Sequence, residues 1–178
     1  MQLIHRVLVL LTALVALTAG TIAPASASDD DYAWRTDASW SADRWGFTKR
    51  QCVSWVAHRM SQRGVSLNNW EGAWGNAADW DNAARRMAHP IGHTAVVGAI
   101  AHWNPGESAV WYPDAQTPNG TLTAGGDGHV GYVQGVHPDG SAVVTQYNLG
   151  GDRAYSIVRV KAPRYIYVRM TAPPGATL

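Results

Sequence analysis

The hydrophobic pattern of this 178-residue chain changes its period at Pro90. Before the proline, apolar residues recur at three- and four-residue intervals from Cys52 to a stop at Gly64, and again over residues 76–87. Such spacing is typical of helices, and glycine is a frequent helix terminator. After the proline, short apolar runs alternate with turn residues, as in strands joined by tight turns. The pattern predicts an α+β domain in which N-terminal helices precede an antiparallel sheet.

The second half of the chain contains four to six candidate strands. We expect a long surface loop from Glu107 to Gly128, because this stretch is rich in Gly, Pro, Asn and Thr. We expect the strands over residues 95–103, 129–136, 141–147, 155–161 and 165–169, with a short strand at 109–112 inside the loop. Residues 34–49 are aromatic and polar without a clean period, which predicts an irregular segment that packs indoles on the core.

Composition supports one folded domain. The chain is 46% hydrophobic and 15% charged, with 18 Gly, 9 Pro and 9 Trp, which excludes a coiled coil and a disordered acidic chain. The formal net charge is +1, and Arg6 in the predicted leader accounts for the excess. A neutral mature chain is a poor nucleic-acid binder, so we expect no nucleic-acid partner.

Residues 1–27 have the layout of a secretory signal peptide. A short polar start ends at Arg6, an apolar run of about 13 residues follows, and Ala25-Ser26-Ala27 stands before an acidic stretch. Because a membrane-spanning helix needs roughly 20 apolar residues, we expect cleavage, export and no membrane contact afterwards. The mature chain is then expected to begin near Ser28 with a linker and irregular segment over residues 28–44, and to fray over residues 171–178.

Cys52 is the single cysteine of an exported chain. An unpaired cysteine in this setting is an intermolecular bridge, a buried apolar filler or a reactive thiol. Its predicted place in the first turn of a helix favours the reactive thiol. The backbone N–H groups there, together with a nearby imidazolium, are expected to lower the thiol pKa and favour thiolate.

A general base for this thiol is predicted in the hairpin over residues 129–147. A two- or four-residue turn centred between Pro138 and Asp139 places His129 opposite Asn148, and Gly131 opposite Gln146. An imidazole and two carboxamides then cluster at one end of the hairpin. By contrast, His58 lies about 240° around the helix from Cys52 and points away from it.

Other candidate sites are weaker. His89 and His93 have the spacing of a helical metal pair, but Pro90 lies between them, so we expect no metal site. The tryptophans could line a sugar or peptide groove, although aromatic filling of a small core is the simpler interpretation.

The chain resembles the CHAP domain family, the cysteine, histidine-dependent amidohydrolases and peptidases. The resemblance spans about residues 45–170. It is carried in order by the segments Lys49-Arg50-Gln51-Cys52-Val53-Ser54-Trp55-Val56, Asn76-Ala77-Ala78-Asp79-Trp80, Val97-Gly98-Ala99-Ile100-Ala101, Gly128-His129-Val130-Gly131-Tyr132-Val133 and Gln146-Tyr147-Asn148.

The resemblance implies a papain-like α+β fold and cleavage of amide bonds in peptidoglycan. It maps Cys52 onto the nucleophile and His129 onto the general base. Many family members carry Glu where this chain has Gln146, which favours Asn148, or both amides, as the group that orients the imidazole. The 107–128 loop is longer than usual for the family and is expected to shape substrate choice.

The resulting hypothesis is a secreted, cell-wall-associated, monomeric hydrolase that needs no cofactor. It would act as an N-acetylmuramoyl-L-alanine amidase or a peptide endopeptidase, with Gln51 and the backbone of Cys52 holding the oxyanion. One alternative is a non-catalytic peptidoglycan-binding or inhibitory module on the same scaffold. Another is a different thiol hydrolase of the NlpC type.

Overall fold

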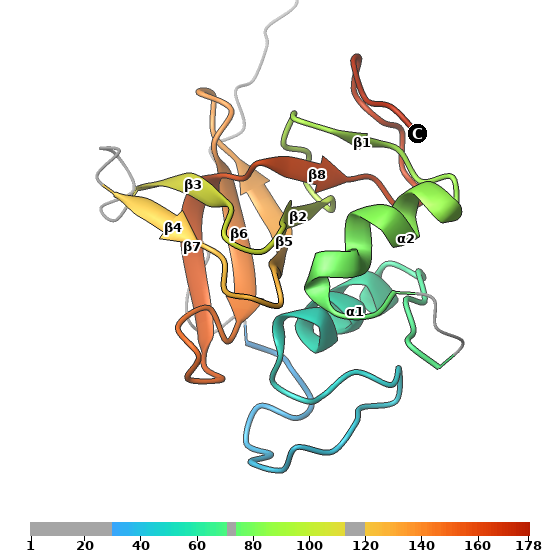
Figure 1. The fold of residues 1–178 in the computed structure, drawn as a ribbon, viewed down its shortest axis with the longest axis vertical. Coiled ribbons are helices and arrows are strands. Elements are labelled where there is room, and N and C mark those ends of the chain that lie inside the picture. Colours follow the sequence, from blue (N-terminus) through green and yellow to red (C-terminus); the bar gives the residue numbers. More distant parts are fainter. Residues whose placement is uncertain (1–29, 71–73, 113–119) are drawn as a thin grey trace, which may run out of the picture.

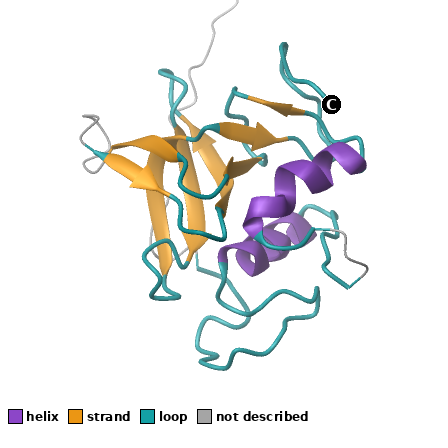
Figure 2. Ribbon diagram, in the orientation of Figure 1, coloured by secondary structure: helices purple, strands orange, loops and turns teal. Residues whose placement is uncertain are grey.

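The computed structural model describes residues 30–70, 74–112 and 120–178. In these ranges, two α-helices and one 3-10 helix pack beside a single antiparallel sheet of eight strands (Figures 1 and 2). The strand order is β1-β8-β2-β5-β6-β7-β3-β4. The elements are α1 (Cys52–Gln62), η2 (Ala77–Asp79), α2 (Trp80–Arg86), β1 (Ile91–Gly92), β2 (Ile100–Trp103), β3 (Ser108–Tyr112), β4 (Thr121–Thr123), β5 (His129–Val136), β6 (Ala142–Tyr147), β7 (Tyr155–Lys161) and β8 (Arg164–Ile166). The predicted α+β class is confirmed.

Helix α1 begins at Cys52, as its apolar spacing predicts. Gln51 is the N-cap residue and has an extended backbone, while the helix closes with a hydrogen bond from Gly64 N–H to Ser61 O. Gly64 has φ +73°, a left-handed conformation that glycine adopts without strain. The buried face of α1 packs on β5 and β6, so the sheet holds the start of the helix in place.

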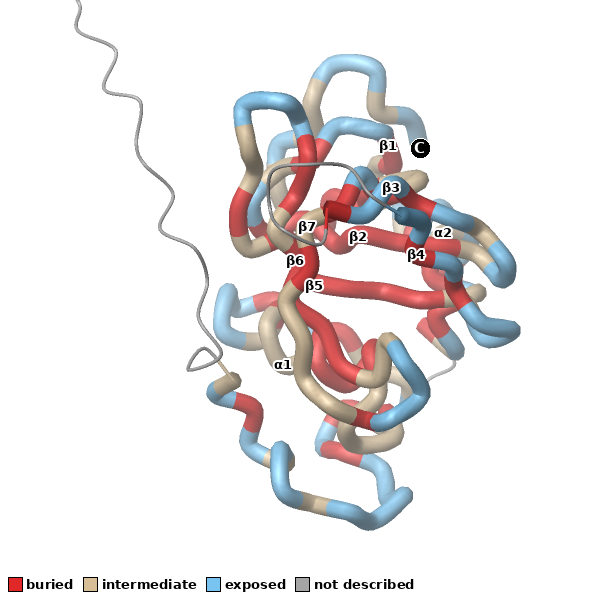
Figure 3. Tube along the Cα trace, turned by 90° about the vertical axis from the view of Figure 1, so that its left-hand side faces the viewer, coloured by how far each residue is buried: buried red, intermediate tan, exposed pale blue. Residues whose placement is uncertain are grey.

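Two apolar clusters lie on opposite faces of the central strands. One joins the helices to the sheet and includes Trp55, Trp80 and Val130, and the other covers the far face and includes Trp103 and Val144. Burial therefore extends along β2, β5 and β6, which run through the interior in Figure 3. Two of these central strands, β5 and β6, carry His129 and Gln146 of the candidate site.

Near the site, the hairpin of β5 and β6 has the predicted register. This register depends on a bulge that the sequence did not indicate. Next to the turn, Val136 pairs with Ala142, one residue out of the predicted register. A bulge between Val133 and Gly135 inserts one residue and restores it, so that Tyr132 pairs with Thr145.

Pairing of β5 with β6 ends at Tyr132 and Thr145. Beyond this point β5 stays paired with β2, and β6 stays paired with β7. The predicted backbone pairs of Gly131 with Gln146 and of His129 with Asn148 therefore do not form. The backbone pairing of β5 with β6 therefore ends next to the candidate site.

The prediction of four to six strands was wrong, because the sheet is extended by very short strands. Strand β1 has two residues and β4 three, too few for a periodic signal. Conversely, the expected strand over residues 95–103 begins only at Ile100. Gly98, at φ +89°, lies in a turn closed by the hydrogen bond from Ala99 N–H to Val96 O.

The C-terminal residues are tied to the sheet, which corrects the expectation of a frayed tail. Thr177 and Ile91 exchange backbone hydrogen bonds of 2.7 and 2.8 Å and form an antiparallel bridge. The predicted signal peptide lies outside the described residues. Within those residues, no helix combines the length and the apolar character needed to cross a membrane.

Candidate active site

A cleft of about 510 Å³ lies where the start of α1 meets the start of β5. Its lining residues fall in four parts of the chain that are distant in the sequence, within 40–53, at 69 and 75–77, within 123–129 and within 148–151. Every sequence-predicted site residue except Gln146 lines it; these are Gln51, Cys52, His129 and Asn148. Gln146 is fully buried behind His129, to which it is hydrogen-bonded.

Cys52 is the first residue of α1 and is 9% exposed. Beyond the last backbone pair of β5 with β6, the backbone N–H of Val130 bonds to the Cys52 sulfur. The sulfur therefore lies against the residue that follows His129. This contact joins the thiol to the strand that carries the imidazole.

The resting thiol is protonated, which corrects the expectation of a thiolate. Burial raises the pKa of Cys52 to about 11, and the hydrogen bonds from the Val130, Val53 and Cys52 N–H groups only partly oppose this. Desolvation disfavours the charged form more than the helix start favours it. The sequence indicated the helix terminus, which lowers the thiol pKa, but not the burial, which raises it by more.

His129 is the first residue of β5 and is 5% exposed. Its Nε2 atom lies 2.6 Å from Oε1 of Gln146. Because a carboxamide oxygen only accepts hydrogen bonds, Nε2 carries the hydrogen and Nδ1 keeps its lone pair. Burial lowers the pKa of His129 to about 4, and the hydrogen bond that the ring donates to Gln146 only partly raises it, so the ring is neutral near pH 7.

Gln146, and not Asn148, orients the imidazole. Asn148 instead donates from Nδ2 to Oε1 of Gln51 at 2.6 Å, and its Oδ1 accepts from the Arg153 N–H at 2.8 Å. Asn148 also has φ +61°, a left-handed conformation that asparagine tolerates better than most residues. The expectation that Asn148, or both amides, orients the ring therefore fails for Asn148, because this backbone turn carries its side chain toward α1 and away from His129.

Gln51 is therefore fixed at the edge of the cleft. Its Oε1 accepts from Asn148, so the Nε2 group at the other end of the same amide is a donor for a second partner. The backbone N–H of Cys52, in the first turn of α1, has no acceptor one turn earlier in the helix. Both residues line the cleft.

The other histidines lie elsewhere. His58 contacts Asp31 at 3.0 Å on the outer side of α1, away from the cleft as predicted. His89 stacks on Trp74, and His93 bonds to the carbonyl of Pro163. Within the described ranges, no group of three His, Cys, Asp or Glu residues is placed to hold a metal ion.

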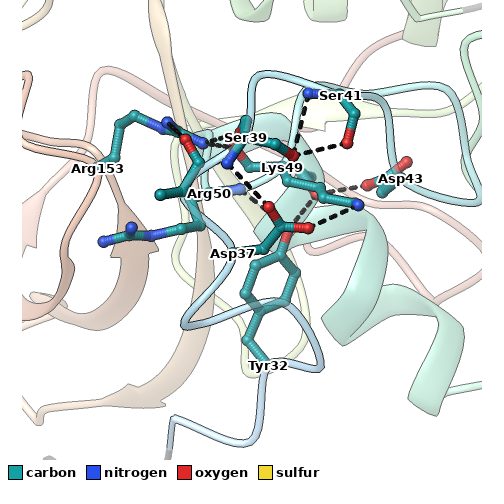
Figure 4. Close-up of polar contacts among 10 residues, drawn as sticks. Tyr32, Asp37, Ser39, Ser41, Asp43, Lys49, Arg50 and Arg153 are labelled. Atoms are coloured by element: carbon teal, nitrogen blue, oxygen red, sulfur yellow. Dashed lines mark hydrogen bonds and ion pairs between the residues drawn. The ribbon is translucent and has the colours of Figure 1, made fainter.

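Sequence reasoning missed Arg153, which holds one rim of the cleft. Its guanidinium is buried and donates to the carbonyls of Ala38, Ser39 and Lys49 at 2.6–3.0 Å (Figure 4). The same guanidinium lies 4.2 Å from the ring of Trp40, a 71% exposed residue that lines the cleft. Nothing near Arg153 in the sequence could have indicated contacts to residues more than 100 positions earlier.

The segment before α1 is held to the helix by buried polar groups. Tyr32 is fully buried, and its hydroxyl accepts from the Arg50 N–H at 3.1 Å and contacts Ser54, which donates to Asp43 (Figure 4). Lys49 and Asp37 form an ion pair at 2.8 Å. From Tyr32 onward, the linker and entry segment expected over residues 28–44 is therefore packed against α1, whose N-cap residue is Gln51.

Comparisons with known proteins identify the family of this chain. The sequence profile described as the CHAP domain matches residues 40–148. This chain belongs to the CHAP domain family.

Two curated relatives come from Staphylococcus aureus strain NCTC 8325 / PS 47. Staphylococcal secretory antigen SsaA is 34% identical over 104 residues, which are 58% of this chain and 31% of the relative. Staphylococcal secretory antigen ssaA2 is 31% identical over 104 residues, which are 58% of this chain and 30% of the relative. The matched part of the chain thus spans about a third of the length of these relatives.

A solved structure is also similar. The N-acetylmuramoyl-L-alanine amidase from Staphylococcus aureus aligns with a TM-score of 0.53 and 26% sequence identity. The alignment covers 82% of this chain and 37% of the amidase chain.

Proposed function

We propose that this chain is a cysteine hydrolase that cleaves amide bonds of peptidoglycan, as an N-acetylmuramoyl-L-alanine amidase or a peptide endopeptidase. One observation carries the proposal: Cys52 and His129 line the same cleft, with the sulfur bonded to the N–H of the residue after His129. Membership of the CHAP family and the likeness to an amidase support the choice of an amide bond as the target.

The proposed reaction starts from a neutral pair. As the Cys52 sulfur attacks the amide carbonyl carbon, its proton passes to Nδ1 of His129. Nε2 stays bonded to Oε1 of Gln146, which keeps the ring in the required tautomer and orientation. Gln146 acts as a positioning residue, since it touches the imidazole and does not line the cleft.

The carbonyl oxygen becomes negatively charged during the attack. The backbone N–H of Cys52 and the Nε2 group of Gln51 are the proposed donors to this oxyanion. Asn148 bonds to Oε1 of Gln51, so the Nε2 group of Gln51 points away from Asn148. Asn148 therefore acts as a positioning residue for this oxyanion donor.

The second half of the reaction returns the enzyme to its resting state. The imidazolium of His129 gives its proton to the leaving amine, and a thioester links Cys52 to the acyl group. The same imidazole then takes a proton from water, which attacks the thioester. As the carbon–sulfur bond breaks and a carboxylic acid leaves, the imidazolium returns this proton to the Cys52 sulfur. The overall reaction is hydrolysis of one amide bond, and water is the only co-reactant.

We place this activity outside the cell and in contact with the cell wall. The signal-peptide pattern of residues 1–27 supports export, as do relatives that are named secretory antigens. We propose a single domain over residues 45–170 that acts as a monomer.

A second candidate function is a binding or inhibitory module for peptidoglycan. The protonated thiol and the uncharged partner of His129 favour it, because both lower the fraction of reactive thiolate. The mature chain incubated with insoluble peptidoglycan separates the two functions. A hydrolase releases new amino groups in proportion to enzyme and time, whereas a module is retained on the wall material without releasing any.

A further inference from the structure

Asp127 is the acidic side chain of the candidate cleft. Among the described residues that line it, no other is an aspartate or glutamate, and none is a lysine or arginine. Asp127 is exposed, and no ion pair within the described part of the chain neutralises it. Its Oδ1 atom accepts a long hydrogen bond of 3.4 Å from Nδ2 of Asn76. The cleft therefore presents one uncompensated negative charge.

The chain around Asp127 leaves room for a ligand. An added Cβ at Gly125 or at Gly126 would meet nothing within 4 Å, so these residues leave open space beside the carboxylate. Gly128 has φ +71°, and a Cβ there would lie 2.8 Å from the backbone of Ala78 and of Trp103. The backbone of Asp127 is also anchored, because its carbonyl accepts from the Ala78 N–H at 2.8 Å. The carboxylate is thus held on a fixed wall.

The charge of Asp127 also reaches the nucleophile. Asp127 contributes to the raised pKa of Cys52, because a nearby negative charge disfavours a thiolate. Without a bound cation, this carboxylate makes ionisation of Cys52 less favourable. A positively charged substrate group would remove this effect by pairing with the carboxylate.

We propose that Asp127 binds an ammonium group of the substrate, close to the amide bond that Cys52 attacks. The substrate class is a peptide that carries a free amine, from a diamino-acid side chain or from an unblocked terminus. The bound ammonium then serves twice, because it positions the peptide and offsets the charge that opposes ionisation of Cys52. This inference rests on the proposed hydrolase function.

The first test measures binding in the absence of turnover. The Cys52→Ala chain is titrated with two synthetic muropeptides that differ only in whether the side-chain amine is free or N-acetylated. We expect the free amine to bind about tenfold more tightly at low salt, and less so at high salt. Adding Asp127→Asn removes the preference, whereas Asp139→Asn, at the far end of the hairpin, makes the same charge change and keeps it.

The second test follows the thiol in the otherwise unaltered chain. Asp127→Asn is expected to increase the rate of Cys52 alkylation by iodoacetamide severalfold near neutral pH, because a negative charge beside the thiol is lost. Asp139→Asn leaves the rate unchanged.

Equal binding of the two muropeptides to Cys52→Ala, or an unchanged preference after Asp127→Asn, overturns the ammonium site. The proposed function fails in a different way. In that case the unaltered chain releases no amino groups from peptidoglycan, while the Asp127-dependent preference in binding persists.

Discussion

The imidazole of His129 donates a 2.6 Å hydrogen bond from Nε2 to Oε1 of Gln146, and both side chains are buried. The two residues lie on the neighbouring strands β5 and β6, beyond the last backbone pair that these strands form. Because Gln146 is neutral, it fixes the tautomer of the ring without supplying the charge that would stabilise an imidazolium. Cys52 and His129 are accordingly both neutral at rest.

Replacing Gln146 with glutamate is expected to change the resting state of the pair. A carboxylate in the same place favours the imidazolium, so the pKa of His129 rises from about 4 and proton transfer from Cys52 becomes easier. In the Gln146→Glu chain, the rate of iodoacetamide alkylation of Cys52 at pH 7 should increase. An identical pH profile of alkylation in the two chains would contradict this account of Gln146.

Gln146→Ala is the matched variant that removes the contact without adding charge. With the ring no longer oriented, hydrolysis of peptidoglycan should fall at least about tenfold. Circular dichroism and thermal melting check that each variant is folded. Full activity of folded Gln146→Ala would show that the contact has no positioning role.

Asn148 should affect the reaction without affecting the titration of His129. In Asn148→Gly the left-handed backbone is retained and the bond to Gln51 is lost, so the oxyanion donor is misplaced and kcat should fall about tenfold. The pH dependence of the residual activity should match that of the unaltered chain. A shifted pH profile would mean that Asn148 acts through the imidazole after all.

The comparison with Asn148→Ala isolates the backbone contribution. Alanine at φ +61° adds strain of about 1 kcal/mol, which glycine avoids. The alanine variant should therefore unfold at lower urea concentration than the glycine variant, with a similar loss of kcat.

The buried neutral imidazole predicts a pH dependence of stability. The pKa of His129 falls from an ordinary 6.5 to about 4 on folding, so between these values the unfolded chain binds a proton that the folded chain does not. Stability from this residue is complete above pH 6.5 and is lost as the pH falls toward 4, by about 3 kcal/mol in total. Urea unfolding at pH 7.0, 5.5 and 4.5 measures the loss.

His129→Gln is the control for this prediction, since it keeps a buried polar side chain and removes the titration. The stability difference between the two chains should change with pH in the direction stated. A difference that stays constant from pH 7.0 to 4.5 would mean that His129 is not held neutral by the fold.

The folded environment also predicts a slow thiol. Cys52 is 9% exposed and burial raises its pKa to about 11, so at pH 7 iodoacetamide should modify it much more slowly in the folded chain than in urea. Mass spectrometry of the intact chain follows the modification. Equal rates in the folded and unfolded chains would show that the thiol is neither buried nor protonated by its surroundings.

Local patterns predicted the elements that carry the site. The start of α1 at Cys52 followed from apolar spacing, and β5 from a run bounded by Gly128 and the turn at Pro138. Which amide meets His129 was not predictable, because it depends on the bulge near Gln134 and on where β5 leaves β6. The Arg153 contacts were not predictable either, because they join loops more than 100 residues apart in the sequence.

The pKa of Cys52 illustrates the same limit. A helix start can be located from the sequence, and it lowers a thiol pKa. The burial that outweighs it arises from packing against β5, which only the three-dimensional arrangement supplies.

Mass spectrometry of the fragments released from purified peptidoglycan tests the proposed hydrolase most directly. The mature chain should release fragments with a new amino group and a new carboxyl group at one defined amide bond. Folded Cys52→Ala and Cys52→Ser should release none. Release of the same fragments by folded Cys52→Ala would contradict the account, because hydrolysis would then not depend on the thiol.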